Sequence, residues 1–425
     1  MNTTPSCIVI IGSGLAGVTA AGALRDAGYE GRVVLVGDEP EVPYDRPPLS
    51  KSVLVHDEFE SLVSEHLPQD IALRSPEQIA LRPASWYSER NIELLLGYRA
   101  TRVDPAEHRV ELDKGDALSY DRLLLVPGAR VRRLPAVERG PAPHSYLRTL
   151  RDSLALRKRL RPGQRIVLLG GGVIGMEVAA SAVLRECDVS VVELAPRIMA
   201  RALCPDISEH IAAYHRSKGV KLHLSAPADG QATGAHPGLA LRDGTLLPAD
   251  LIVVGIGVVP NIELAEAAGL QCEDGIVVNE LGQTSDTDIF AAGDAVRYPD
   301  FFFRRPIRAE NWMHAQNQAA VVARNLLGAG LPYHQIPHMW SDQYDLKIQT
   351  SGMCETEEYV ERGDRTKNKF MLFHTAGGRL IGATGINEAR DMKFAQRLIE
   401  AQIVVDPAKL ADPSFNLKKA AAAAV

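Results

Sequence analysis

The sequence predicts an α/β protein with two copies of one βαβ unit, followed by a smaller α+β module. Residues 7–11 and 165–169 are continuous apolar runs, and each ends in a glycine-rich turn. A helical stretch follows each turn and leads to a second apolar run, at 33–36 and 189–193. Such runs, rich in branched side chains, are typical of strands buried on both faces of a parallel sheet. From about residue 337 onward the composition changes, which indicates a separate module.

Further elements are expected between and after the two units. Residues 122–126, 251–257 and 288–294 have the pattern of buried strands. We interpret the strand near Val253 as the one that returns the chain to the first sheet. The other predicted elements are a helix at 309–327, strands at 369–373 and 380–383, a helix at 391–401 and a fraying, alanine-rich end at 418–425.

The composition limits the class of protein. The chain has 425 residues, 46% of them apolar and 24% charged, which is the mixture of a globular protein of two or three domains. Its net charge of −6 argues against nucleic-acid binding, which normally needs a basic face. No long apolar run and no signal-peptide pattern occurs, so no membrane segment is expected. The five cysteines are scattered without a CxxC pair, which favours a reducing, cytoplasmic location.

The first glycine-rich turn has the spacing of a dinucleotide-binding loop. Gly12 permits the tight turn, Gly14 lets the backbone approach a pyrophosphate, and Gly17 lets the helix pack against the strand. The helix N-terminus then presents free N–H groups to the phosphates. An acidic residue is expected about 20 residues further on, where it binds ribose hydroxyls. Asp38 and Glu39 stand there.

The second turn repeats this pattern with Gly170, Gly172 and Gly175, and Glu193 ends the next strand. A carboxylate at that place accepts from the 2′-hydroxyl of NAD and repels a 2′-phosphate, which favours NADH over NADPH. The alternative is that Glu193 merely ends the strand at the surface. Two dinucleotide folds in one chain indicate two dinucleotides, and the simplest pair is a bound FAD and a mobile NADH.

At this point the residues resemble a known family. The segment 43–51, with the letters PYDRPPLSK, is similar to the signature of oxygenase-coupled, FAD-dependent ferredoxin reductases. Further likeness covers 170–178, 253–261, 284–294 and 340–343, nearly the whole chain in the family's order. The nearest likeness is to the reductase components of biphenyl-type aromatic-ring dioxygenases.

The resemblance implies a glutathione-reductase-like fold with two Rossmann-like domains. The FAD domain would comprise 1–128 and 256–336, the NAD domain 129–255, and the C-terminal α+β domain 337–425. One departure stands out: Pro127 replaces the threonine that the family usually shows in an Ala-Thr-Gly turn. Proline lacks both the N–H donor and the hydroxyl, so the local flavin contact is expected to differ.

The resemblance also gives roles to an ion pair. It implies that Arg46 and Lys51 lie along the flavin, with Lys51 near its reactive N5 edge and paired with Glu177. A buried ammonium needs such a partner because an unpaired buried charge costs on the order of 3–5 kcal/mol. A positive group beside the ring favours flavin reduction. The alternative for Glu177 is an ordinary acid in the first turn of a helix.

Five more residues take roles from the resemblance. Asp294 would accept a hydrogen bond from the flavin ribityl chain, and the backbone of Ala100 would contact the adenine. Trp340 would pack beside the flavin near the docking place of the partner, although a plain core tryptophan is the alternative. Gly257 would border the nicotinamide. Glu310 lies in a stretch similar to a nicotinamide-facing segment of the family.

These expectations define an NADH:ferredoxin oxidoreductase. The chain lacks the grouped cysteines that an iron–sulfur cluster needs and shows no metal site, so the electron acceptor would be a separate [2Fe–2S] ferredoxin. We expect a Rieske-type ferredoxin that feeds the terminal oxygenase of an aromatic-ring dioxygenase system. The alternatives are a reductase for the ferredoxin of a cytochrome P450 and a non-enzymatic, NADH-sensing flavoprotein. A disulfide reductase or peroxidase is disfavoured because residues 19–63 contain no cysteine.

Overall fold

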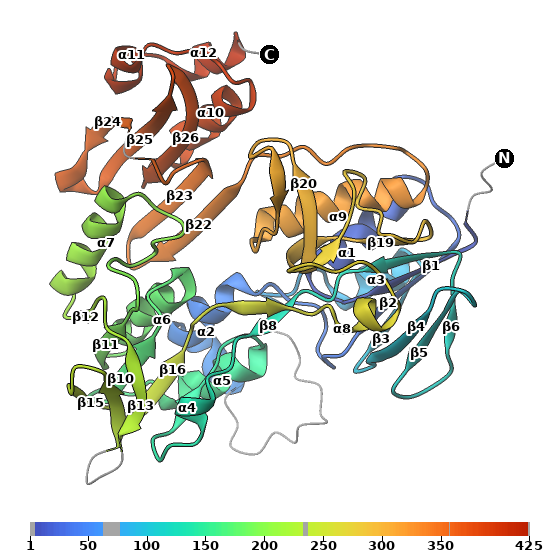
Figure 1. Ribbon diagram of the computed structural model, residues 1–425, viewed down its shortest axis with the longest axis horizontal. Helices are drawn as coiled ribbons and strands as arrows, with labels where there is room; N and C mark the ends of the chain where they lie inside the picture. The colour runs from blue at the N-terminus through green and yellow to red at the C-terminus, as the bar shows by residue number, and fades with distance from the viewer. Residues whose placement is uncertain (1–4, 63–76, 233–236, 357, 424–425) are drawn as a thin grey trace. The chain divides into compact units, whose positions relative to one another are not determined.

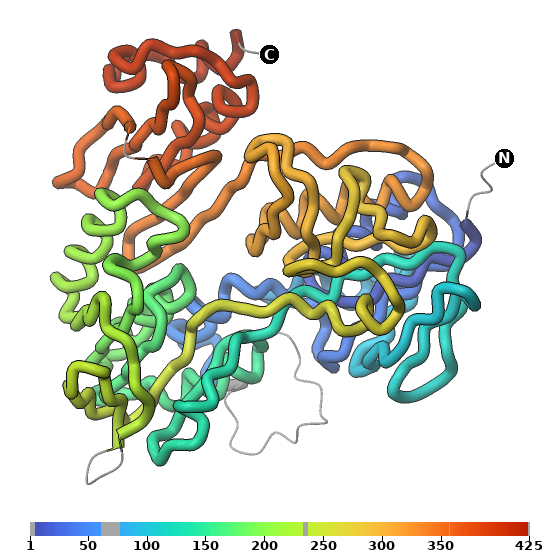
Figure 2. The backbone as a smooth tube through the Cα atoms, in the orientation of Figure 1, coloured from blue at the N-terminus to red at the C-terminus, as the bar shows by residue number. Residues whose placement is uncertain are grey.

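The computed structural model describes residues 5–62, 77–232, 237–356 and 358–423, and it divides into two compact units. Unit 1 comprises Met1–Arg46, Ser64–Arg130 and Val258–Gln335. Unit 2 comprises Pro47–Val63, Val131–Gly257 and Ile336–Val425. Each unit is therefore assembled from segments that are far apart in the sequence, as the course of the backbone in Figure 2 shows.

A five-stranded parallel sheet forms the centre of unit 1 (Figure 1). In sheet order its strands are β19 (Ile289–Ala291), β7 (Arg122–Leu125), β1 (Cys7–Ile11), β2 (Arg32–Gly37) and β3 (Ile92–Leu96). Helices α1 (Leu15–Asp26) and α9 (Trp312–Leu326) share one hydrophobic core with one face of this sheet. Alanines 20, 21, 319 and 323 are fully buried there, so the two helices can pack closely.

Smaller elements complete unit 1. A three-stranded sheet, β4 (Ala100–Asp104), β5 (Arg109–Leu112) and β6 (Leu118–Ser119), contributes to the core on the other face. The remaining elements are α3 (Ala84–Glu89), α8 (Glu263–Ala267), β18 (Ile276–Val277), η3 (Gly293–Ala295), β20 (Val296–Asp300) and β21 (Arg305–Ile307). Strands β8 (Ala129–Val131) and β17 (Val258–Pro260) lie where the chain passes from one unit to the other.

Unit 2 contains a second five-stranded parallel sheet. In order its strands are β12 (Lys221–His223), β11 (Asp188–Val192), β10 (Arg165–Leu169), β16 (Leu251–Val254) and β9 (His144–Ser145). The interpretation of the strand near Val253 was wrong, because β16 pairs with β10 and belongs to this second sheet. Its apolar sequence identifies a buried strand but not the sheet to which it belongs. The other elements are α4 (Pro135–Glu138), α5 (Leu150–Arg159), α6 (Val173–Leu184), α7 (Pro205–Ser217), β13 (Ala228–Ala232), β14 (Gly238–Leu241) and β15 (Leu246–Pro248).

The segment with η1 (Pro47–Ser50), α2 (Ser52–Val55) and η2 (Asp57–Leu62) also belongs to unit 2. Side chains of α5 and α6 hold its backbone. Ser153 donates to the carbonyl of Leu49 at 2.6 Å, and Ser181 donates to that of Ser50 at 2.7 Å. The buried guanidinium of Arg157 donates to another carbonyl of the segment at 3.1 Å. Lys51 is consequently fixed next to the second glycine-loop helix.

The C-terminal module is a five-stranded antiparallel sheet with helices. Its strands, in order, are β22 (His338–Gln343), β23 (Leu346–Gly352), β26 (Arg379–Ile386), β25 (Lys369–Ala376) and β24 (Tyr359–Asp364). Its helices are η4 (Arg365–Lys367), α10 (Ala389–Glu400), α11 (Pro407–Ala411) and α12 (Leu417–Ala422). Residues 418–422 of the expected fraying end belong to α12, which the Asn416 side chain caps and in which Leu417 and Ala421 are buried. Residues 424 and 425 of that end lie outside the described residues. Among the described residues, no helix is long and apolar enough to cross a membrane.

Three buried histidines are expected to make the protein sensitive to mild acid. Burial lowers the pKa of His215 and His374 from 6.5 to about 4 and that of His314 to about 3. Between about pH 6.5 and 4 the unfolded chain therefore binds protons that the folded protein does not. Stability should fall as the pH is lowered through this range, by about 1.4 kcal/mol per pH unit for each histidine. Melting temperatures measured across that range check this prediction.

A matched pair of variants isolates the effect. His374→Gln removes one buried titrating group, so the fall in melting temperature with acid should become shallower. His56→Gln serves as the control because the His56 side chain is 62% exposed. Identical slopes for the wild type and His374→Gln would contradict the assignment of this acid sensitivity to buried histidines.

Candidate functional site

The glycine loop of unit 1 has one open position between two closed ones. A Cβ atom on Gly12 would lie 2.1 Å from the carbonyl oxygen of Val126, and one on Gly17 would lie 1.9 Å from that of Gly12. A Cβ atom on Gly14 would meet nothing within 4 Å. Gly12 and Gly17 are therefore required by the fold itself. Gly14 is not, and its bare backbone faces open space.

The loop of unit 2 repeats this arrangement closely. A Cβ atom on Gly170 would lie 2.2 Å from the carbonyl oxygen of Gly255, and one on Gly175 would lie 2.0 Å from that of Gly170. Gly172, like Gly14, would meet nothing within 4 Å. Each fold thus has the same cradle, open at its central glycine.

Both open glycines are helix N-caps. Gly14 directly precedes α1 and Gly172 directly precedes α6, and neither helix has a side-chain cap or an acidic residue in its first turn. The first backbone N–H groups of these helices are left for an external anion, which the helix dipole also favours. The two loops fit the pyrophosphates of two dinucleotides.

The two folds differ at the end of the second strand. The strand registers align Gly37 in unit 1 with Glu193 in unit 2. The Glu193 carboxylate accepts hydrogen bonds from the backbone N–H groups of Gly171 at 2.6 Å and Ala195 at 2.7 Å. It therefore lies against the glycine loop, where a ribose hydroxyl could reach it. Arg197 donates to the carbonyls of residues 200 and 203, so its guanidinium is bound to the loop that follows.

In unit 1 the acids follow one and two residues after Gly37. Asp38 is exposed and lies 3.9 Å from Arg99. Glu39 accepts hydrogen bonds from the Tyr44 hydroxyl and, at 2.6 Å, from Arg46 Nη2. Glu39 and Arg46 are thereby brought together. A Cβ atom on Gly37 would lie 2.0 Å from the Ser13 hydroxyl oxygen, so the absence of a side chain at Gly37 makes room for Ser13.

The other predicted flavin residues of unit 1 lie on separate elements. Asp294 lies in η3, directly after Gly293, whose N–H donates to the buried Gln318 at 2.8 Å. Ala100 begins β4. The carbonyl of Pro127 accepts from the Asn261 side chain at 2.9 Å, so another residue holds this turn.

Glu310 is also part of unit 1, whereas the second glycine loop is part of unit 2. The Glu310 carboxylate forms an ion pair with Arg308. This ion pair is the interaction that the structure gives to the predicted nicotinamide-facing acid.

Lys51 and Glu177 form an ion pair within unit 2. Lys51 Nζ lies 2.8 Å from Glu177 Oε2 and donates to the carbonyl of Pro47 at 3.1 Å. The Glu177 side chain is only 2% exposed, and the hydroxyls of Ser50 and Ser341 also donate to it. A buried carboxylate with three donors is well compensated. The sequence did not single out either serine.

Trp340 and Gly257 complete the predicted set. Trp340 is half-buried on β22, next to Ser341. Gly257 has a φ of +100°, which favours glycine, and its carbonyl accepts from the N–H of Arg132 at 2.9 Å.

The cysteines have no redox-active arrangement in the described part of the chain, where all five are free thiols. Burial raises the pKa of Cys187 to about 11 and that of Cys354 to about 12. Both thiols are therefore protonated near neutral pH and are weak nucleophiles.

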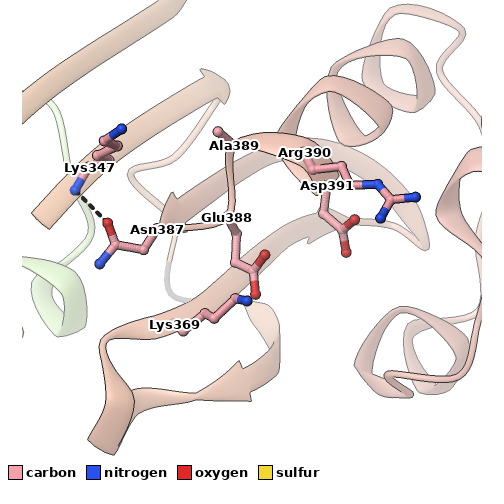
Figure 3. A pocket seen from close by; sticks show the side chains of 7 residues that line it. All are labelled: Lys347, Lys369, Asn387, Glu388, Ala389, Arg390 and Asp391. Carbon is pink, nitrogen blue, oxygen red and sulfur yellow. Dashed lines mark hydrogen bonds between the residues drawn. The ribbon is translucent and has the colours of Figure 1, made fainter.

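A surface cavity of about 580 Å³ lies in the C-terminal module (Figure 3). It is lined by Lys347, Lys369, Asn387, Glu388, Ala389, Arg390 and Asp391. The backbone N–H of Lys347 donates to Asn387 Oδ1 at 2.8 Å. Cations and carboxylates are mixed in this lining, and none of the predicted cofactor residues belongs to it.

Two family models and a curated relative match most of the chain. The model of the pyridine nucleotide-disulphide oxidoreductases matches residues 6–319, and the reductase C-terminal model matches residues 338–421. The ferredoxin–NAD(+) reductase component of the anthranilate 1,2-dioxygenase system from Burkholderia cepacia is 39% identical. The match covers 96% of this chain and 98% of that protein.

The chain is also similar over nearly its full length to solved structures of reductases. The ferredoxin reductase for the CYP199A2 system from Rhodopseudomonas palustris has a TM-score of 0.90 at 38% identity, covering 98% of this chain and 100% of that one. The reductase in the covalent putidaredoxin reductase–putidaredoxin complex has a TM-score of 0.89 at 35% identity, covering 99% of each chain.

Proposed function

The chain belongs to the pyridine nucleotide-disulphide oxidoreductase family, and from this membership we propose that it is an NADH-dependent, FAD-containing ferredoxin reductase. The observation that carries the proposal is the pair of matching glycine cradles, one in each unit. Bound FAD would accept a hydride from NADH and release electrons one at a time to a one-electron carrier.

We propose that unit 1 holds FAD. Gly12, Gly14 and Gly17 form the pyrophosphate cradle. Glu39 and Arg46, which are hydrogen-bonded to each other, form a polar group close behind β2. Asp294 takes the ribityl chain.

Asp38 and the backbone of Ala100 remain proposed contacts for the adenosine part of FAD. The FAD domain would comprise 1–128 and 256–336, the NAD domain 129–255 and the C-terminal domain 337–425. The two family models support a separate C-terminal domain, because the first match ends at residue 319 and the second begins at residue 338.

We propose that unit 2 holds NADH. Gly170, Gly172 and Gly175 cradle its pyrophosphate, and Glu193 accepts from its adenosine ribose. Gly257 leaves room beside the nicotinamide, and Glu310 is kept as a proposed contact of the nicotinamide.

Lys51 is proposed to present its ammonium to the flavin edge that receives the hydride, with Glu177 as the counter-charge. Trp340 is proposed to pack beside the flavin. The two serine donors on Glu177 support this role, because they hold the carboxylate next to the ammonium.

The proposed partner is a ferredoxin with a [2Fe–2S] cluster. We propose the Rieske type and a terminal aromatic-ring dioxygenase, which the similarity to the anthranilate system supports. A ferredoxin that serves a cytochrome P450 is the second candidate, supported by the similar reductase of the CYP199A2 system.

The test is anaerobic stopped-flow spectroscopy of the purified protein with NADH and with NADPH. Rapid bleaching of the flavin band by NADH, followed by reoxidation on addition of a [2Fe–2S] ferredoxin, is the expected result. A protein that holds no flavin, or whose flavin NADH does not bleach, would exclude this function. Bleaching without transfer to Rieske or plant-type ferredoxins would favour an NADH-sensing flavoprotein.

Glu193→Ala is expected to reduce the preference for NADH over NADPH. The carboxylate accepts from a ribose hydroxyl and repels a 2′-phosphate, so its loss weakens NADH and favours NADPH. We expect the ratio of the two kcat/KM values to fall on the order of 100-fold, which corresponds to about 2.7 kcal/mol. Arg216→Gln is the control, because Arg216 pairs with Glu209 on the exposed side of α7. An unchanged ratio would remove Glu193 as the selector.

A further inference from the structure

The Lys51–Glu177 ion pair is the inner end of a longer hydrogen-bond chain in unit 2. Oε1 of Glu177 accepts from the Ser341 hydroxyl at 2.7 Å. Nε2 of Gln343 donates to the same hydroxyl oxygen at 3.0 Å. Oε1 of Gln343 lies 2.8 Å from Nε2 of His215. Neither the glycine-loop pattern nor the family resemblance gives a role to these three residues.

The chemistry of the groups fixes the direction of every bond. Nε2 of Gln343 is also 3.5 Å from the sulfur of Met199, so the amide nitrogen faces inward and its oxygen faces His215. An amide oxygen only accepts, so Nε2 of His215 must carry the proton. Nδ1 of His215 is then an acceptor, and the Tyr344 hydroxyl lies 3.3 Å from it. All donors therefore point toward Glu177.

This direction determines where the hydroxyl hydrogen of Ser341 points. Its oxygen already accepts from Gln343, so its own O–H is directed to the Glu177 carboxylate. The other carboxylate oxygen accepts from Ser50 and Lys51. Each oxygen of Glu177 thus has its own donors, and rotation of the carboxylate would break both sets.

The hydrogen-bond chain joins three elements, and its side chains are buried from water. Glu177 lies on α6, His215 on α7, and Ser341 and Gln343 on β22 of the C-terminal module, and Figure 1 shows these elements next to one another. The Ser341, Gln343 and His215 side chains are 0% exposed. An unpaired buried donor or acceptor is costly, so the members hold one another in place.

The outer end of the chain is held in a strained conformation. Tyr344 lies in the turn between β22 and β23 and has a φ of +57°, a region that side-chain-bearing residues rarely adopt. Its ring contacts that of His215, with 5.0 Å between centroids, and that of Tyr214 at 5.8 Å. The strained backbone of Tyr344 places its hydroxyl at Nδ1 of His215, the ring nitrogen that can accept a hydrogen bond.

We propose that Ser341, Gln343 and His215 are positioning residues for flavin reduction, because their directed hydrogen bonds hold Glu177, and through it the Lys51 ammonium, in a single place. This inference rests on the proposed function, in which Lys51 faces the flavin. The C-terminal module supplies two of the three residues and thereby completes the ion-pair site. Burial lowers the pKa of His215 to about 4, so the neutral ring that the chain requires is present at neutral pH.

The first test compares Ser341→Ala with Ser341→Thr in the FAD-loaded enzyme. The alanine variant lacks the donor to Glu177, so the limiting rate of flavin bleaching by NADH should fall about tenfold, with the NADH concentration for half the limiting rate unchanged. The threonine variant keeps a hydroxyl and should recover most of the rate. Asp342→Asn is the control, because Asp342 lies on the same strand and is exposed.

The second test does not depend on turnover. Brief labelling with acetic anhydride, read by peptide mass spectrometry, measures how firmly Lys51 is held. Labelling of Lys51 relative to the exposed Lys221 should rise several-fold in Ser341→Ala and in Gln343→Leu, and should stay at the wild-type level in Ser341→Thr.

The outcomes separate the two proposals. Wild-type bleaching with equal rates and equal Lys51 labelling in all variants would overturn the positioning role and leave the reductase function standing. A wild type without flavin bleaching would remove the proposed function, and the labelling comparison would still decide whether the chain holds Lys51. A tenfold slower Ser341→Thr would also count against the role, because its hydroxyl remains.

Discussion

Gly172→Ala is expected to give a folded, flavin-containing protein that NADH reduces poorly. The structure tolerates the substitution, because Gly172 has a φ of −75° and an added Cβ atom meets nothing within 4 Å. The methyl group would instead fill the space that a pyrophosphate needs above the helix N-terminus. The affinity for NADH should fall on the order of 10- to 100-fold, the effect of one or two lost hydrogen bonds to charged oxygens. The concentration dependence of flavin bleaching measures this loss.

Gly14→Ala is the matched variant in unit 1. Gly14 has a φ of −71° and the same open space, so the protein should fold while its FAD content falls. Gly12→Ala and Gly170→Ala provide the opposite control. Both positions have positive φ, and an added Cβ atom would collide with a backbone carbonyl, so these variants should lose thermal stability. If Gly172→Ala bound NADH normally, the cradle would not be the NADH site.

The glycine loops could be predicted from sequence because their function depends on local geometry. A strand, a glycine-rich turn and a helix N-terminus lie within about 12 residues, and the spacing of the glycines determines which backbone atoms can approach. In both loops the first and third glycines would bring a Cβ atom against a backbone carbonyl oxygen, and the second glycine is open. The helices at 312–326 and 389–400 were also predictable, because their apolar periodicity is regular.

The acidic residues after the second strand of unit 1, Asp38 and Glu39, show that residue spacing alone does not fix the position of a side chain. The second strand of unit 1 reaches Gly37 at the position that Glu193 occupies in unit 2, so Asp38 and Glu39 are displaced along the chain. An expected separation of about 20 residues does not resolve a shift of one or two positions. The side chains of Tyr44 and Arg46 then bind Glu39, and these contacts depend on the fold of the following loop.

The hydrogen-bond chain behind Glu177 could not be predicted, because its pairings are distant in sequence. Ser341 bonds a residue 164 positions away, and Gln343 bonds one 128 positions away. The signal that could have indicated it is the alternation on β22, where two polar side chains occupy the buried face of one strand. Buried polar residues at alternate positions require partners, although the sequence does not identify them.

Lys51→Met is expected to slow flavin reduction by NADH about 100-fold and to destabilise the protein. Methionine keeps the length and apolar stem of the side chain but removes the charge. The Glu177 carboxylate, 2% exposed, would retain only the two serine donors, and removal of a charged partner from a buried pair costs about 3–5 kcal/mol. Since the Lys51 side chain is 20% exposed, we expect a value near the lower limit. Stopped-flow bleaching and urea unfolding measure the two effects.

The double variant Lys51→Met/Glu177→Gln separates catalysis from stability. A neutral glutamine can still accept from Ser341, and no uncompensated charge is left, so most of the lost stability should return. The rate should not return, because the ammonium that faces the flavin is still missing. Recovery of both would mean that Lys51 acts only by compensating Glu177. A slow but stable double variant would mean that the charge itself promotes hydride acceptance, and that Glu177 and the residues behind it serve to hold that charge in place.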